Sequence, residues 1–274
     1  MIFGADALSK ESMQAITREF NYSESVFVLE PGGDDCDAGL RIFTPGGELP
    51  FAGHPTVGAA AAIARSRHLD GELVLQLPAG QFPVRASGQG EVWRAEFENP
   101  NLPRVAGDGP DAGLIENALG LPAGSVEAGD ACPRRCGAGI DFIYAAAPLE
   151  DVQAARLNTA AWDALGVGDA CGVLLYAAAA QGSVADWHVR MFGPHIGVAE
   201  DPATGSAAAG LPAQLMAAGA LADRSYDWTV AQGIEMGRPS RIRVRFEVRN
   251  GAFESLVIGG NAIAVTTGEV CSES

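Results

Sequence analysis

The chain has 274 residues, which suits two compact domains, and its formal net charge is −16. Such an acidic surface repels phosphate backbones and anionic lipids, so we expect neither nucleic acid nor a membrane among its partners. Apolar residues make up 47% of the chain but occur in short runs, none near the roughly 20 residues of a membrane helix. The first residues also lack the pattern of a secretory signal, so we expect a cytoplasmic protein.

Several kinds of chemistry are disfavoured by the residue types that the chain lacks. Lys10 is the only lysine and falls in a predicted helix, whereas Schiff-base and pyridoxal-phosphate enzymes need a lysine in a pocket. The five cysteines are scattered and odd in number, which indicates reduced thiols rather than disulfides. Neither they nor the four histidines follow a metal-ligand spacing. We therefore expect no metal and no cofactor.

The first hundred residues combine helices with short strands. Ser9 is a suitable N-cap for a helix that reaches about Phe20, because Met13, Ile16 and Phe20 recur at helical spacing. After a polar joint, strands are expected over 26–31 and 40–43, a helix from about Pro55 to Arg67, and an antiparallel meander over 72–77, 81–87 and 91–97. The prolines and asparagines of 99–103 suit neither helix nor strand, so we place a domain boundary there, between 1–103 and 104–274.

The second half repeats this scheme. Helices are expected over 111–119 and 149–165 and from Pro202 to about Ala218; strands are expected over 139–147, 172–179, 186–192 and 241–248, with a hairpin-like end over 257–270. Strands separated mostly by turns, with one helix of small residues in each half, predict an α+β protein with two similar lobes.

The two helices of small residues begin alike. His54-Pro55 and Asp201-Pro202 each place a polar residue at the expected N-cap and a proline at the first helical position, and glycines and alanines follow. A helix that is small and apolar all round is buried, yet the amides of its first turn lack partners and carry partial positive charge. Both could simply be well-capped core helices. Two matching copies favour a ligand with an anionic group.

Three titratable side chains stand near these helix starts. Glu24 lies in the polar joint before an apolar strand, His54 stands beside Pro55, and Asp201 stands at the mouth of the second helix. Each has an ordinary interpretation: a solvated glutamate, a structural histidine and an N-cap aspartate. Their convergence with two anion-accepting helix starts suggests acid–base catalysis.

At this point the sequence resembles the PhzF-like phenazine-biosynthesis proteins. The resemblance is carried by NYSESVFVLEP, RIFTPGGELPFAGHPTVGAA and RMFGPHIGVAEDPATGSAAAGL, and later by GIEMGRPSRIRV and VIGGNAIAV. These blocks are long and run in order across nearly the whole chain. The resemblance implies a diaminopimelate-epimerase-like fold, with two pseudo-symmetric lobes, each a mostly antiparallel sheet around a central helix. The site would lie in the cleft between the lobes, and the last strand could return to the first lobe.

The resemblance also implies roles for particular residues. In family members that isomerise dihydro-hydroxyanthranilate, the glutamate at the place of Glu24 shuttles the proton, with site partners at the places of His54 and Asp201. The substrate-binding residues that the resemblance implies are Ser23, Gly53, Gly205 and Ser206. Related epimerases carry two cysteines at the facing acid–base positions, where this chain has Glu24 and Asp201, so a two-thiol epimerase is disfavoured. A homodimer is the family expectation.

One departure concerns the N-terminus. The family usually has a strand and a Gly-Asn-Pro loop well before the helix that begins here near Ser9, whereas this chain opens with MIFGADAL. We therefore expect an N-terminal lobe that lacks the usual first strand.

The resulting hypothesis is a cofactor-independent isomerase that acts on a small anionic substrate. Glu24, packed against 26–29, is expected to have a raised pKa and to move a proton from one carbon to another. Asp201 and His54 would orient the substrate or relay a second proton. The alternatives are a lyase or hydrolase that uses the same carboxylates, and a binding protein without catalysis. A dehydrogenase and a serine hydrolase are disfavoured because neither GxGxxG nor GxSxG occurs.

Overall fold

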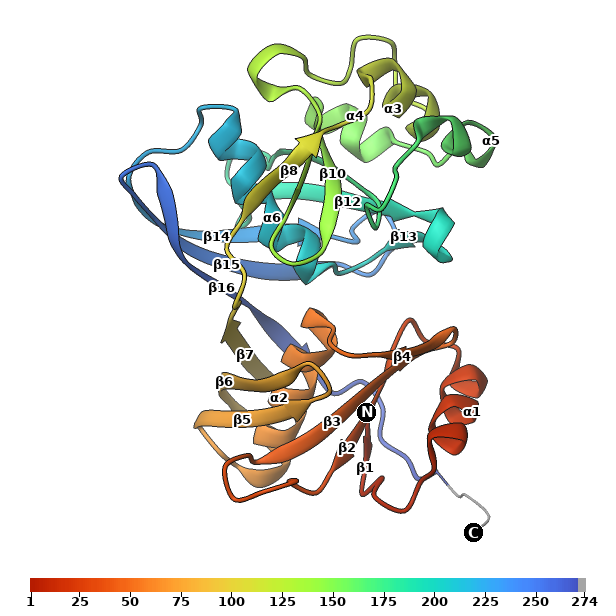
Figure 1. The fold of residues 1–274 in the computed structure, drawn as a ribbon, viewed down its shortest axis with the longest axis vertical. Helices are drawn as coiled ribbons and strands as arrows, with labels where there is room; N and C mark the ends of the chain where they lie inside the picture. Colours follow the sequence, from red (N-terminus) through yellow and green to blue (C-terminus); the bar gives the residue numbers. More distant parts are fainter. Residues whose placement is uncertain (271–274) are drawn as a thin grey trace. The chain divides into compact units, whose positions relative to one another are not determined.

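The computed structural model describes residues 1–270. These residues form two compact units, drawn in Figure 1. Unit 1 comprises Met1–Glu98 and the chain from Gly259 onward, and unit 2 is Asn99–Ile258. Both units combine sheet with helix, so the predicted α+β class is confirmed.

The sheet of unit 1 has the strand order β1-β2-β3-β5-β6-β7-β16, with β4 beside β3. Its strands are β1 (Ile2–Phe3), β2 (Ser25–Leu29), β3 (Ala38–Thr44), β4 (Gly47–Leu49), β5 (Gly71–Leu77), β6 (Gly80–Gln89), β7 (Val92–Glu98) and the end of β16 (Ala252–Ile263). The ladders β5–β6 and β6–β7 are antiparallel, as the sequence predicted, whereas β1–β2 and β3–β5 are parallel.

Two helices complete unit 1. In α1 (Lys10–Phe20), the Ser9 hydroxyl accepts a hydrogen bond from the amide of Ser12 at 3.1 Å, so the predicted N-cap is confirmed. The second helix, α2 (Gly53–Arg67), packs against β5, β6 and β7. Its alanines at 59, 60, 61 and 64 are at most 1% exposed, because small side chains let the strands approach the helix closely. It is the predicted central helix of this unit (Figure 1).

The strand order continues through β16 into unit 2 as β16-β15-β14-β12-β11-β10-β9-β8, and β13 pairs with β12. Its strands are β8 (Arg104–Asp108), β9 (Arg134–Gly137), β10 (Asp141–Ala146), β11 (Val173–Ala178), β12 (Trp187–Gly193), β13 (Val198–Asp201), β14 (Arg224–Gln232), β15 (Ser240–Arg249) and the first part of β16. Most ladders are antiparallel, and β10–β11 and β12–β14 are parallel.

The central helix of unit 2 is α6 (Gly205–Ala217), which packs against β8, β9, β10 and β15. The hydroxyl of Tyr144, on β10, donates a hydrogen bond to the carbonyl of Ala207 at 2.7 Å. Gly210 leaves room for that side chain, because a Cβ at this position would lie 2.2 Å from the Tyr144 oxygen. Shorter helices, α3 (Ala112–Leu119), α4 (Leu149–Ala154) and α5 (Thr159–Trp162), cover a separate core around Ile143 and Val173.

Three sequence-based expectations about these elements were wrong. The helix predicted over 149–165 is interrupted after α4, because the amides of Arg156 and Asn158 bond instead to carbonyls at the end of α3. The chain end over 257–270 is no hairpin: β16 continues to Ile263, and no regular structure follows up to residue 270. A short strand, β1, precedes the first helix, where none was expected.

Candidate functional site

The conformation of Glu24 is set by the ends of two elements. Helix α1 ends at Asn21, which adopts the left-handed conformation with φ of 50° and turns the chain toward β2. The side chain of Glu24 is 18% exposed, and β2 begins at the next residue and is buried over Ser25–Val28. Ser23 is exposed beside it. The local structure therefore holds a carboxylate at the margin of a buried strand.

His54 lies next to this carboxylate. Its Nε2 is 3.1 Å from Glu24 Oε2, which makes an ion pair when the imidazole is protonated. The structure corrects how the helix begins: α2 starts at Gly53 with Ala52 as N-cap, so His54 is its second residue and not the cap. Pro55 is the third residue, where its missing N–H is still without consequence because the first turn lacks intrahelical acceptors.

The expected direction of the Glu24 pKa shift was wrong. Burial raises the pKa, as the apolar strand suggested, but the hydrogen bond and the charge of His54, together with the hydrogen bond of Ser23, outweigh burial. The pKa of Glu24 therefore lies below its ordinary value. At neutral pH the side chain is a carboxylate that can accept a proton.

Asp201 lies in unit 2 at the end of β13. Helix α6 begins only at Gly205, after the N-cap Thr204, so Asp201 is not the N-cap and Pro202 is not the first helical residue. Asp201 instead accepts a hydrogen bond through Oδ2 from the Thr204 hydroxyl at 2.6 Å. Its carbonyl accepts a second from Nε2 of Gln232 at 2.7 Å. The carboxylate thus stands just before the start of the central helix.

The first amides of both central helices have no hydrogen-bond acceptor among the described residues. None of the residues in 1–270 accepts a hydrogen bond from the backbone N–H of Gly53, Gly205 or Ser206. Because such amides carry partial positive charge, each helix start can accept an anionic group. In unit 1 this start lies beside Glu24 and His54, and in unit 2 beside Asp201.

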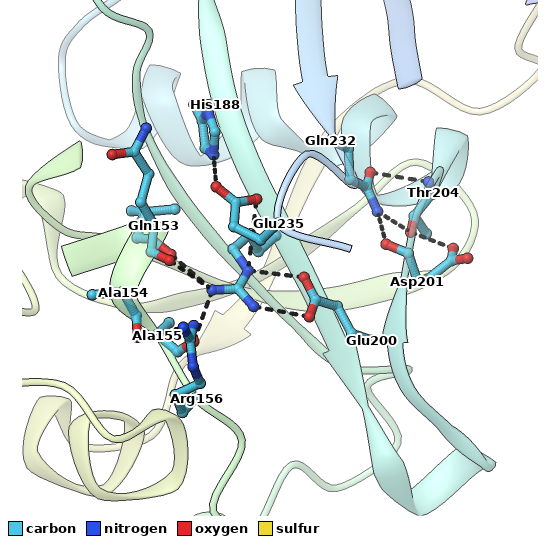
Figure 2. Close-up of polar contacts among 12 residues, drawn as sticks. Gln153, Ala154, Ala155, Arg156, His188, Glu200, Asp201, Thr204, Gln232 and Glu235 are labelled. Atoms are coloured by element: carbon cyan, nitrogen blue, oxygen red, sulfur yellow. Dashed lines mark hydrogen bonds and ion pairs between the residues drawn. The ribbon is translucent and has the colours of Figure 1, made fainter. Parts of the chain in front are cut away.

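A buried polar network behind Asp201 was missed by the sequence analysis (Figure 2). Arg190, on β12, is 3% exposed and donates two hydrogen bonds to Glu200, at 2.8 and 2.9 Å, and others to carbonyls at the end of α4. Nearby, Nε2 of His188 lies 2.8 Å from Oε1 of Glu235. Arg190 thereby fixes the strand that ends at Asp201. Alternation along 187–193 places His188 and Arg190 on one face of the strand, but such a pattern is typical of a face toward solvent, so their burial could not be predicted.

The described part of the chain offers little for metal or thiol chemistry. No group of three or more His, Cys, Asp or Glu side chains in it could hold a metal ion. Burial raises the pKa of the Cys136 thiol to about 12 and also raises that of Cys171. These two thiols are therefore poor proton acceptors at neutral pH. Among these residues no helix is long and apolar enough to span a membrane.

Comparison with known proteins identifies the family. The sequence model of phenazine biosynthesis-like proteins matches residues 1–268. The chain belongs to this family. A trans-2,3-dihydro-3-hydroxyanthranilate isomerase from Pseudomonas aeruginosa is 35% identical over 271 residues, which cover 98% of this chain and 91% of that protein. An uncharacterized isomerase from Mesorhizobium japonicum is 36% identical over 279 residues, with 98% and 92% coverage.

Solved structures agree with this assignment. A predicted epimerase from Pseudomonas aeruginosa has 31% identity and a TM-score of 0.74, covering 97% of this chain and 92% of that one. A PhzF-family protein from Bacillus anthracis, 22% identical, has the same fold with a TM-score of 0.82 over 94% of this chain and 88% of that one. A hydroxyproline epimerase from Agrobacterium vitis shares the fold at a TM-score of 0.54, over 88% and 72% of the two chains. The chain is a PhzF-like isomerase with the diaminopimelate-epimerase-like fold.

Proposed function

We propose that the protein isomerises a small anionic substrate of the dihydro-hydroxyanthranilate type, with Glu24 as the group that carries the proton. The contact between Glu24 and His54 carries this proposal, because it keeps a largely buried carboxylate ionised and fixed in place. The full-length similarity to trans-2,3-dihydro-3-hydroxyanthranilate isomerases supports the substrate class.

In the proposed reaction, the Glu24 carboxylate removes a proton from one carbon of the substrate. The electrons of that C–H bond shift the double bonds, and the carboxylic acid, after exchanging its proton with solvent, delivers a proton to a second carbon. Composition and oxidation state do not change, so the step requires no external oxidant or reductant. Because the pKa of Glu24 lies below its ordinary value, protonated Glu24 is a stronger acid than an ordinary glutamic acid side chain and returns a proton more readily.

The other residues are assigned supporting roles. We assign to His54 the orientation of Glu24, with which it is in contact. Asp201 would orient the substrate or take part in a second proton transfer. Ser23 and the amides of Gly53, Gly205 and Ser206 would bind its anionic and polar groups, because these helix-start amides lack acceptors among residues 1–270.

The decisive experiment follows trans-2,3-dihydro-3-hydroxyanthranilate by NMR in deuterated water. With wild-type protein we expect deuterium to enter a carbon position while the carbon skeleton is unchanged. Glu24→Gln preserves the shape of the side chain but cannot accept a proton, so kcat should fall by about 10²-fold or more. Glu30 is an exposed glutamate just after the other end of β2. As a matched control, Glu30→Gln should retain wild-type activity. Full turnover by Glu24→Gln would contradict the assignment.

The same samples separate the proposal from its alternatives. A hydrolase would change the mass of the substrate by one water, and a lyase would split it, whereas isomerisation leaves the mass unchanged. Tight binding without exchange would indicate a binding protein. We also propose a homodimer in the cytoplasm, in keeping with the family resemblance and the acidic composition; light scattering in solution would test the dimer.

A further inference from the structure

Gln232 is fully buried at the end of β14, and within the described residues its side-chain amide bonds only to the segment that joins Asp201 to α6 (Figure 2). Its Oε1 accepts a hydrogen bond from the amide of Thr204 at 3.0 Å. Its Nε2 donates to the carbonyl of Asp201 at 2.7 Å and to the hydroxyl oxygen of Thr204 at 2.8 Å. One side chain therefore binds both ends of a four-residue segment.

The direction of these hydrogen bonds follows from their chemistry. The amide N–H of Thr204 can only donate, so it requires Oε1 of Gln232 to face it, and this places Nε2 toward the Thr204 hydroxyl. Because Nε2 can only donate, the hydroxyl oxygen accepts from it. The hydroxyl proton then points to Oδ2 of Asp201, 2.6 Å away. The chain of donors runs from Gln232 through Thr204 to Asp201.

This chain of donors leaves the two oxygens of Asp201 in different situations. Oδ2 is bound by Thr204, whereas none of the residues in 1–270 forms a hydrogen bond with Oδ1. The same contacts fix Thr204, the N-cap residue of α6, immediately before the amides of Gly205 and Ser206. The segment also approaches the backbone of Gly233 closely, since a Cβ there would lie 2.8 Å from the carbonyl oxygen of Pro202.

We propose that Gln232 is a positioning residue for the reaction. Through Thr204 it holds the Asp201 carboxylate with one oxygen bound and the other open to the substrate, and it sets the start of α6 beside that carboxylate. This inference rests on the proposed role of Asp201 in the reaction. Gln232 itself is fully buried, so it acts through Thr204 and Asp201 and not on the substrate.

Isosteric substitutions test this arrangement. Gln232→Glu removes the donor to Asp201 and Thr204, and Thr204→Val removes the hydroxyl. We expect each to lower kcat by about tenfold to a hundredfold, the effect of losing a hydrogen bond to a charged group. Thr204→Ser keeps the hydroxyl and should retain activity within about threefold. In a double-mutant cycle, Gln232→Glu should cost little more once Thr204→Val is present, because both act along one chain of donors.

A matched control separates positioning from stability. Gln214 is also fully buried in unit 2, and its amide bonds to carbonyls of Ala131 and Cys132, away from Asp201. Gln214→Glu should lower Tm as Gln232→Glu does, while the folded enzyme keeps its kcat. If both variants lose Tm and both keep kcat, Gln232 is merely structural and the inference is overturned.

Two further measurements keep this inference separate from the proposed function. Asp201→Asn should lose activity; if it keeps full turnover, the role assigned to Asp201 fails whatever Gln232 does. A crystal structure of Gln232→Glu is independent of any substrate, and there we expect Oδ2 of Asp201 to have moved away from the Thr204 hydroxyl. An unchanged carboxylate position in that structure would overturn the inference even if the proposed function holds.

Discussion

At the scale of single residues, the pair Glu24 and His54 shows how one contact decides the state of a base. Burial alone would favour the protonated carboxyl group, which can donate a proton but not remove one. The neighbouring imidazole and Ser23 reverse that preference, so the pKa of Glu24 falls below its ordinary value. The group is therefore ready to accept a proton at neutral pH.

This pair gives a prediction for the pH dependence of the reaction. Activity that needs ionised Glu24 is lost as pH falls through its pKa, so the wild-type enzyme should stay active into the acid range. In His54→Ala, burial still raises the pKa of Glu24, but the imidazole that lowers it is absent. The pKa of Glu24 therefore rises. The acid limb of kcat/KM against pH should then move to higher pH. The contribution of Glu24 to stability follows the same sign: it is present above the unfolded-state pKa and is lost as pH falls through the folded-state pKa.

The control for this prediction lies at the other end of the same helix. His68 is the exposed C-cap residue of α2, with φ of 52°, and asparagine tolerates that left-handed conformation. His68→Asn should leave the acid limb in place. If the acid limb of kcat/KM shifted equally in both variants, it would not reflect the ionisation of Glu24.

At the scale of elements, the two central helices look alike in sequence but differ in how closely the sheet approaches them. Gly58 in α2 faces the mobile end of a side chain, since an added Cβ would lie 3.0 Å from Cε of Met1. Gly210 in α6 faces the Tyr144 hydroxyl and the backbone of Gly137, which an added Cβ would approach to 2.2 and 2.9 Å. The same substitution should therefore have opposite effects in the two helices.

We expect Gly210→Ala to lower the free energy of unfolding by about 1–3 kcal/mol or more, because a packed core accommodates an inserted methyl group poorly. Gly58→Ala should be neutral or stabilising by up to about 1 kcal/mol, because alanine favours the helix and the tip of Met1 can move aside. Urea unfolding of both variants measures the difference. Equal stability of the two variants would contradict the close approach of Tyr144 to α6.

The features of these elements that could be predicted from the sequence are those fixed by contacts between residues close together in the chain. The caps of α1 and α3 were predictable because Ser9 and Asp111 bind amides two or three residues away. The start of α6 was not, because its N-cap Thr204 is held by Gln232, 28 residues along the chain. For the same reason Glu24 and His54 could be named as candidates, while their contact, and with it the direction of the pKa shift, required the fold.

At the scale of the whole molecule, the chain passes between the two units twice, once at Glu98–Asn99 and once within β16 at Ile258–Gly259. The last strand therefore joins the strands of the two units in one hydrogen-bonded order, with β15 as its neighbour in unit 2 and β7 in unit 1. Unit 2 is continuous in sequence, whereas unit 1 is completed by residues that arrive at the end of the chain. Local patterns predicted two similar lobes but could not assign this strand, because pairing partners more than 150 residues apart leave no local signal.

At Gly259, the second part of β16 packs against β7 of unit 1. A Cβ at this position would lie 2.6 Å from Cβ of Glu96 and 2.8 Å from the carbonyl oxygen of Ala95, both on β7. Gly259→Ala should therefore force β16 away from β7 and destabilise unit 1 by about 1–3 kcal/mol. Hydrogen exchange should show faster exchange of the β6 and β7 amides, with the amides of β10 and β11 unchanged. Gly47→Ala, on β4 with open space around the new methyl group, is the matched control and should exchange like wild type. If amides of both units exchange faster together, the two units unfold as one cooperative body, and the strand they share is the element that couples them.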